Sequence, residues 1–166
     1  MMKKLIFIRH GRAEDPASGI SDFERSLTLK GKVISKLMAR KLREIEKSPG
    51  IIITSPAFRA IETALIFAGE FGIEHHQIKI NSYLYYKMNI RYLPEILAGA
   101  GEETDTITMF GHNPSFTEIA NSLCSEGCDF LPKCGIIGIS FNIKTWPEIR
   151  QKIGKQEYYL KPEKTL

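Results

Sequence analysis

Short apolar runs alternate along this chain with longer segments in which apolar residues recur at helical spacing. The runs at 5–8, 51–54, 78–80 and 106–110 span three to five residues each, which predicts short buried strands. Between 28 and 45, apolar residues recur every three or four positions and predict a long helix with Thr28 as its N-cap. Ser55 and Pro56 are placed as the N-cap and first turn of a second helix, which Gly72 ends.

The second half of the chain continues this alternation. Residues 81–105 predict a loop that contains a modest helix around 92–98, and another helix is expected near Pro114. The segments 135–142 and 157–160 predict two further strands, paired as an antiparallel edge. This order of elements predicts an α/β fold, a three-layer α/β/α sandwich with a mostly parallel central sheet. We expect residues 1–166 to form one domain.

Composition excludes several classes of protein. The hydrophobic and charged fractions, 43% and 25%, are those of an ordinary globular protein. The net charge of +4 comes from interspersed residues, which argues against nucleic acid as a partner. No apolar stretch reaches membrane-spanning length, and the four apolar residues after Lys4 are too few for a signal peptide. We therefore expect a cytoplasmic protein with no membrane partner.

The three cysteines, Cys124, Cys128 and Cys134, lie close together in the sequence. A zinc site would require a fourth ligand and usually a tighter pair of cysteines. Buried or half-buried thiols are the favoured interpretation.

Candidate chemistry gathers where predicted strands end. Arg9 and His10 follow the first strand, Arg59 lies early in the helix after the second, and His112 follows the fourth. Because ligands of such sheets bind outside the carboxyl ends of the strands, these side chains are expected on one rim. Imidazole supplies a nucleophilic nitrogen near neutral pH, and guanidinium supplies a forked permanent cation. Each residue alone has an ordinary structural explanation, whereas together they predict a phosphoryl-binding pocket.

The motifs around these residues resemble the ordered signature of the histidine phosphatase superfamily, which has a phosphoglycerate mutase-like fold. The motifs are Arg9-His10-Gly11, Ser55-Pro56-Ala57-Phe58-Arg59-Ala60 with Glu62-Thr63-Ala64, and Gly111-His112-Asn113-Pro114. The short chain and the segment Ser26-Leu27-Thr28-x-x-Gly31 resemble the small SixA-like branch, the phosphohistidine phosphatases.

The resemblance implies a metal-independent phosphatase without a cofactor. His10 would attack phosphorus and form a transient phosphohistidine, with its second nitrogen held by a backbone carbonyl. Arg9 and Arg59 would clamp the phosphoryl oxygens, and His112, as an imidazolium, would donate to them. The resemblance also places Asn113 at the substrate.

One position departs from many superfamily members. Where they carry a glutamate after the third strand, this chain has Tyr86, a weak acid at neutral pH. Expulsion of an alkoxide gains roughly 10²- to 10⁴-fold from a proton donor, whereas an imidazole leaves more easily. Asp22 and Glu24 are alternative acids and Arg25 an additional cation at the rim, with a solvated turn as the simpler explanation for all three.

The short segment between the third and fourth strands favours an open pocket mouth that suits a phosphorylated protein. Tyr83, Tyr85, Tyr86 and Tyr92 either line that mouth or pack against the sheet. We therefore predict protein dephosphorylation in signal transduction, with phosphohistidine of a phosphotransfer protein as substrate. The alternatives are a phosphatase of small phosphorylated metabolites and a module that binds phosphate without turnover. His75 and His76 are predicted to lie on the surface.

Overall fold

A computed structural model describes residues 2–16, 19–86, 88–151 and 153–164. The strands are β1 (Met2–Arg9), β2 (Ile51–Thr54), β3 (Lys79–Ile80), β4 (Thr106–Gly111), β5 (Ile136–Asn142) and β6 (Lys155–Leu160). The α-helices are α1 (Leu29–Ile45), α2 (Phe58–Phe71), α3 (Tyr83–Tyr86), α4 (Leu93–Ala98) and α5 (Ser115–Leu123). Short 3₁₀ turns span Asp22–Glu24, His75–Gln77, Ile90–Tyr92 and Trp146–Glu148. His75 and His76 are exposed, as predicted.

The strands form one sheet in the order β3-β2-β4-β1-β5-β6. β1, β2, β3 and β4 run parallel to one another, and β5 pairs antiparallel with both β1 and β6. The predicted mostly parallel sheet with an antiparallel C-terminal edge is therefore confirmed. This topology brings the carboxyl ends of the four parallel strands to one edge of the sheet.

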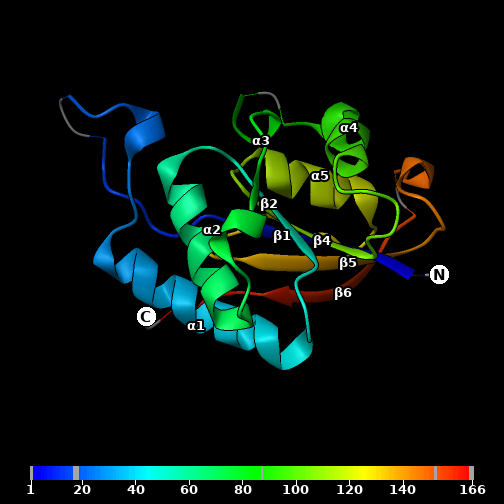
Figure 1. The fold of residues 1–166 in the computed structure, drawn as a ribbon, viewed down its shortest axis with the longest axis horizontal. Coiled ribbons are helices and arrows are strands. Elements are labelled where there is room, and N and C mark those ends of the chain that lie inside the picture. Colours follow the sequence, from blue (N-terminus) through cyan, green and yellow to red (C-terminus); the bar gives the residue numbers. More distant parts are fainter. Residues whose placement is uncertain (1, 17–18, 87, 152, 165–166) are drawn as a thin grey trace.

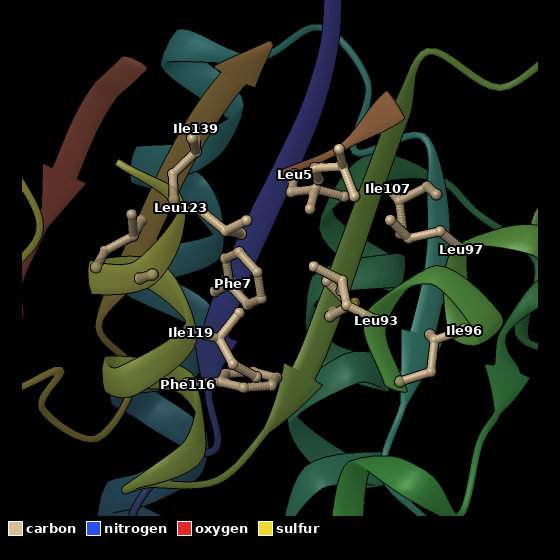
Figure 2. Packing of buried hydrophobic residues seen from close by; sticks show 14 of the residues in the cluster. Leu5, Phe7, Leu93, Ile96, Leu97, Ile107, Phe116, Ile119, Leu123 and Ile139 are labelled. Atoms are coloured by element: carbon tan, nitrogen blue, oxygen red, sulfur yellow. The ribbon is translucent and has the colours of Figure 1, made fainter. Parts of the chain in front are cut away.

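Helices cover both faces of the sheet, as Figure 1 shows. Ile6 and Ile8 of β1 pack with residues of α1 and α2 such as Leu42 and Phe67. Leu5 and Phe7 alternate with them and face the opposite side. There they contact the layer formed by α4 and α5, seen in Figure 2 with labelled residues that include Leu93, Ile96, Phe116, Ile119 and Leu123. The continuous apolar run of β1 is thus explained by burial on both faces.

The two predicted helix caps had different outcomes. Thr28 caps α1, since its hydroxyl accepts a hydrogen bond from the Gly31 amide at 3.0 Å. The prediction for Ser55 was wrong, because α2 begins at Phe58 and its N-cap is Ala57. Ser55 instead remains in the turn after β2, where its hydroxyl lies at the edge of the sheet that carries the candidate site.

The predicted burial of the cysteines is confirmed. Cys124 and Cys134 are buried and Cys128 is half-buried. Burial raises the pKa of Cys134 to about 11, which keeps its thiol protonated at neutral pH. None of the helices in the described ranges combines the length and apolar character needed to cross a bilayer.

Candidate active site

A pocket of about 520 Å³ opens at the edge where the parallel strands end. It is lined by His10, Asp22, Arg59, Tyr85, Tyr86, His112 and Asn113. These residues follow β1, β2, β3 and β4 or lie in the loop before α1, so the sheet topology gathers them. The two histidine rings lie with their centroids 5.0 Å apart. His10 and His112 therefore share one cavity.

His10 has a fixed ring orientation. Its Nδ1 lies 2.7 Å from the carbonyl oxygen of Gly11, the kind of backbone partner that the sequence predicted. A proton on Nδ1 makes this hydrogen bond and leaves Nε2 unprotonated, and Arg59 Nε donates to Nε2 at 3.3 Å. A side chain at Gly11 would not fit, because a Cβ there would lie 2.7 Å from Ser35 Oγ.

Burial is the main reason why His10 is uncharged. It lowers the pKa to about 3, and the positive field of Arg59 and Arg9 acts in the same direction, against the opposing hydrogen bond to Gly11. His10 is therefore a neutral imidazole near neutral pH, and the electron pair of its unprotonated Nε2 accepts the hydrogen bond from Arg59.

Arg59 is buried, with 6% of its surface exposed, although its place early in a helix suggested a residue on the surface rim. Its guanidinium donates to the Asp22 carbonyl at 2.6 Å and forms a 3.0 Å ion pair with the Asp22 carboxylate. Tyr85 donates to the same carboxylate oxygen at 2.8 Å. The carbonyl oxygen and the carboxylate of Asp22 thus together occupy the forked donor that a phosphoryl group would otherwise bind.

These contacts argue against Asp22 as a general acid. Partial burial raises its pKa, but hydrogen bonds from Tyr85, Arg25 and Arg59 outweigh that effect and hold the pKa at about 2. Asp22 is therefore ionised at neutral pH and has no proton to give. Glu24, the other suggested acid, lies outside the pocket and accepts a hydrogen bond from Ser21.

His112 is held by Ser55. Its Nε2 lies 2.8 Å from Ser55 Oγ, while its buried Nδ1 has no hydrogen-bond partner among the described residues. Burial, followed by the charge of Arg59, lowers its pKa to about 4. His112 is therefore a neutral imidazole near neutral pH in this structure, and its predicted charge when it donates to a bound phosphoryl group stays a prediction.

Ser55 is the site residue that sequence reasoning missed. It was placed as a helix cap, whereas its hydroxyl orients His112. Its position immediately after β2, at the strand edge where ligands collect, was the available signal.

Arg9 lies beside the pocket rather than among its lining residues. Its Nη1 donates to the Leu131 carbonyl at 3.1 Å, and its guanidinium lies over the Phe130 ring at 5.1 Å. Its Nε is buried and lacks a partner among the described residues. Arg9 is near enough to lower the pKa of both His10 and His112, so its positive charge reaches the pocket.

Two other predicted contacts occupy supporting positions. Arg25 donates to the Glu14 carbonyl at 2.6 Å and to the Asp22 carboxylate at 2.8 Å, so it acts on the pocket through Asp22. Asn113 lines the pocket, and its amide nitrogen donates to the Leu131 carbonyl at 2.8 Å. Its amide oxygen accepts from Thr117 at 2.9 Å.

The tyrosines divide between the two roles that the sequence left open. Tyr85 and Tyr86 line the pocket, and Tyr86 is 67% exposed at its mouth. Tyr83 and Tyr92 stack on each other, with ring centroids 4.9 Å apart, and pack against the core. Burial and the bond to Asp22 raise the pKa of Tyr85, so its phenol stays protonated.

Comparison with known proteins agrees with this arrangement. Residues 5–80 match the profile of the Histidine phosphatase superfamily (branch 1). A protein of unassigned function from Picosynechococcus sp. is 30% identical over 148 residues, which cover 82% of this chain and 84% of that protein.

Solved structures share the fold at lower identity. The protein histidine phosphatase SixA in complex with tungstate is 20% identical, with a TM-score of 0.80 over 96% of this chain and 97% of that one. A candidate phosphohistidine phosphatase SixA from Agrobacterium tumefaciens is 22% identical, with a TM-score of 0.78 over 97% and 99% of the two chains. A mycobacterial glucosyl-3-phosphoglycerate phosphatase is 13% identical, with a TM-score of 0.67 over 95% and 98%.

The chain belongs to the histidine phosphatase superfamily. Its fold is the compact SixA-like version shared with these solved structures.

Proposed function

We propose that this protein is a phosphohistidine phosphatase that works through a covalent intermediate on His10. Its substrate is a phosphohistidine carried by another protein, as in phosphotransfer signalling. The observation that carries the proposal is the unprotonated Nε2 of His10, a residue that lines the pocket and whose Nδ1 is held by Gly11.

The first step is attack of His10 Nε2 on phosphorus. A new P–N bond forms on His10 while the P–N bond of the substrate breaks, and the leaving imidazole keeps that electron pair. The substrate reacts as the N-phosphorylated imidazolium, in which the other ring nitrogen has taken a proton from solvent, so the leaving group departs as neutral imidazole. In the second step water attacks the phosphohistidine, which releases inorganic phosphate and restores His10.

Charge in the transition state is balanced by cations of the protein. Arg59 is directly beside the nucleophile, and Arg9 adds a second guanidinium at the rim. Nδ1 of His112 and Nε of Arg9 are buried without a hydrogen-bond partner among the described residues, and we assign them hydrogen bonds to the phosphoryl group. Since these groups supply the positive charge, no metal ion is required. Binding a phosphoryl group also requires Asp22 to release Arg59.

The chemistry of the leaving group favours phosphohistidine over a phosphate monoester. Asp22 is the only carboxyl group among the described residues that line the pocket, and its pKa of about 2 leaves it without a proton. A phosphate monoester expels a strongly basic alkoxide and gains much from a proton donor. An N-phosphorylated imidazole that is protonated on its other ring nitrogen expels neutral imidazole, a far weaker base, so it suits a pocket without a protonated carboxyl group.

Turnover of matched substrates tests the proposal. We expect kcat/KM for a phosphohistidine peptide to exceed that for a panel of sugar phosphates by at least about tenfold, in buffer containing a metal chelator. His10→Ala provides the background rate of spontaneous hydrolysis, and His76→Ala is the matched control at an exposed histidine. Equal or faster turnover of a sugar phosphate would reject the substrate class and favour a small-molecule phosphomonoesterase. Binding without turnover of any substrate would favour a phosphate-binding module.

A further inference from the structure

A second depression, of about 580 Å³, lies beside the candidate active site. Its lining includes Arg9, Arg12, Lys30, Lys133 and Lys164, together with the aromatic ring of Phe130. We call this surface the basic groove. It is distinct from the catalytic pocket, whose lining contains none of these six residues.

The positive charge of the basic groove is largely uncompensated. Arg12, Lys30 and Lys133 are exposed, and within the described ranges none of their side chains is paired with a carboxylate. The single carboxylate in the lining, Glu163, is paired with Lys41 at 3.4 Å. Burial and then the positive charges of Arg9, Arg12 and Arg25 lower the pKa of Lys133. The groove therefore presents a concentrated positive field to solvent.

The groove and the catalytic pocket belong to one face of the molecule. Leu131 O accepts hydrogen bonds from both Arg9 of the groove and Asn113 of the pocket. A further depression is lined by Arg9 and Phe130 of the groove and by Asn113 of the pocket, and its lining also includes the carboxylates Glu118 and Asp129. The topology explains why the groove and the pocket adjoin. Arg12 follows β1, Lys133 precedes β5 and Lys164 follows β6, so all three lie at the edge of the sheet where the pocket opens. Figure 1 shows the C-terminal segment beside α1, which carries Lys30.

The groove also offers apolar contact. Phe130 is 59% exposed, and Ile34 and Pro132 lie in the same lining. The cations of the groove come from α1, two loops and the C-terminal segment, so they are presented on several elements of the surface. A protein surface on which acidic residues alternate with apolar ones is complementary to this groove. Its carboxylates would pair with the cations, and its apolar side chains would contact the exposed ring of Phe130.

We propose that the basic groove docks an acidic surface of the phosphorylated protein substrate, next to the phosphohistidine that enters the pocket. This inference rests on the proposed function for the identity of the substrate. Docking places the phosphorylated side chain at His10 and supplies affinity that the open pocket lacks.

The first test compares two phosphohistidine peptides. In one peptide the residues on both sides of the phosphohistidine are acidic, and in the other they are uncharged. For the wild-type protein we expect KM to be roughly tenfold lower for the acidic peptide. The variant Lys30→Glu/Lys133→Glu is expected to lose this preference while keeping kcat. Arg9 is left unchanged because it belongs to the proposed catalytic machinery.

The matched control is Lys47→Glu/Lys144→Glu. It changes the net charge by the same amount. Both lysines are exposed and lie at the edge of the sheet away from the groove, since Lys47 precedes β2 and Lys144 follows β5. We expect it to retain the preference for the acidic peptide. Loss of the preference in the control as well, or no preference in the wild type, would overturn the docking proposal.

A binding experiment separates this proposal from the proposed function. The acidic peptide without a phosphoryl group is titrated into His10→Ala, with fluorescence anisotropy as the readout. Binding that Lys30→Glu/Lys133→Glu abolishes supports docking even if phosphohistidine is not turned over. Turnover without such binding would overturn docking alone. Stronger groove-dependent binding of a DNA duplex or of anionic phospholipid vesicles would overturn the assignment to an acidic protein.

Discussion

The catalytic pocket and the basic groove lie on one face but hold their charges in opposite ways. In the pocket, the buried Arg59 is paired with Asp22, and His10 and His112 are neutral. In the groove, Arg12, Lys30 and Lys133 are exposed and form no ion pair with a carboxylate of the described chain. Enclosed, oriented groups act over hydrogen-bond distances and can stabilise a transition state, whereas exposed cations act over longer distances on a partner. The comparison therefore separates the chemistry of the site from the recognition of its substrate.

The largest expected effect comes from removing the nucleophile. His10→Ala should lower kcat by roughly a thousandfold or more for every phosphorylated substrate, because it removes the nitrogen that the proposed mechanism uses as nucleophile. Binding of an acidic peptide to the groove should remain unchanged. Steady-state kinetics together with peptide titration measure the two effects. Parallel loss of both would show that pocket and groove are not separable.

Replacement of Arg59 is expected to have the next largest effect. Arg59→Ala should lower kcat by roughly 10²- to 10³-fold, since it removes the cation beside the attacked phosphorus. It should also lower the free energy of unfolding by about 1–2 kcal/mol, because the buried side chain bonds to His10 and Asp22. Urea unfolding and kinetics measure these losses, and Arg59→Lys is the control that keeps the charge. Normal activity in Arg59→Ala would contradict the assigned role.

The neutrality of the pocket histidines predicts a specific pH dependence. Their pKa values of about 3 and 4 lie below the usual 6.5, so both rings should stay uncharged at pH 5. Because the unfolded chain then binds more protons than the folded one, the free energy of unfolding should fall as the pH drops from about 6.5 to 4. An NMR titration of the ring protons checks this directly. A midpoint near 6.5 for either His10 or His112 would show that the pocket does not exclude charge.

Ionic strength should produce the smallest effect and sharpen the comparison. Raising the salt concentration to about 0.5 M should reduce kcat/KM for an acidic phosphohistidine peptide roughly threefold, because exposed charges are screened. Free phosphohistidine should be affected less, since its contacts are with buried groups. Kinetics at several salt concentrations measure the difference. An equal response of both substrates would argue against a separate docking surface.

The sequence predicted the parts of the site that depend on strand ends. The apolar runs predicted the two buried strands, and these strands place Arg9, His10 and His112 at their carboxyl ends. The capping pattern predicted that Thr28 begins α1. Loop residues were not predictable in the same way. The loop before α1 has no hydrophobic periodicity, so nothing indicated that Asp22 would fold back onto Arg59.

The charge states within the pocket also had to await the structure. The sequence shows which groups ionise, but burial and the distance to Arg59 determine that His112 is neutral. The contact between Ser55 and His112 also becomes visible only in the structure, because the two residues are 57 positions apart in the chain.

The central claim is that His10 carries the phosphoryl group during turnover. The direct test is brief incubation with a ³²P-labelled phosphoryl donor followed by an alkaline quench. We predict a protein-bound label that is stable to base, labile to acid and absent from His10→Ala, while His76→Ala is labelled normally. Turnover without any such label, or undiminished label in His10→Ala, would contradict the account.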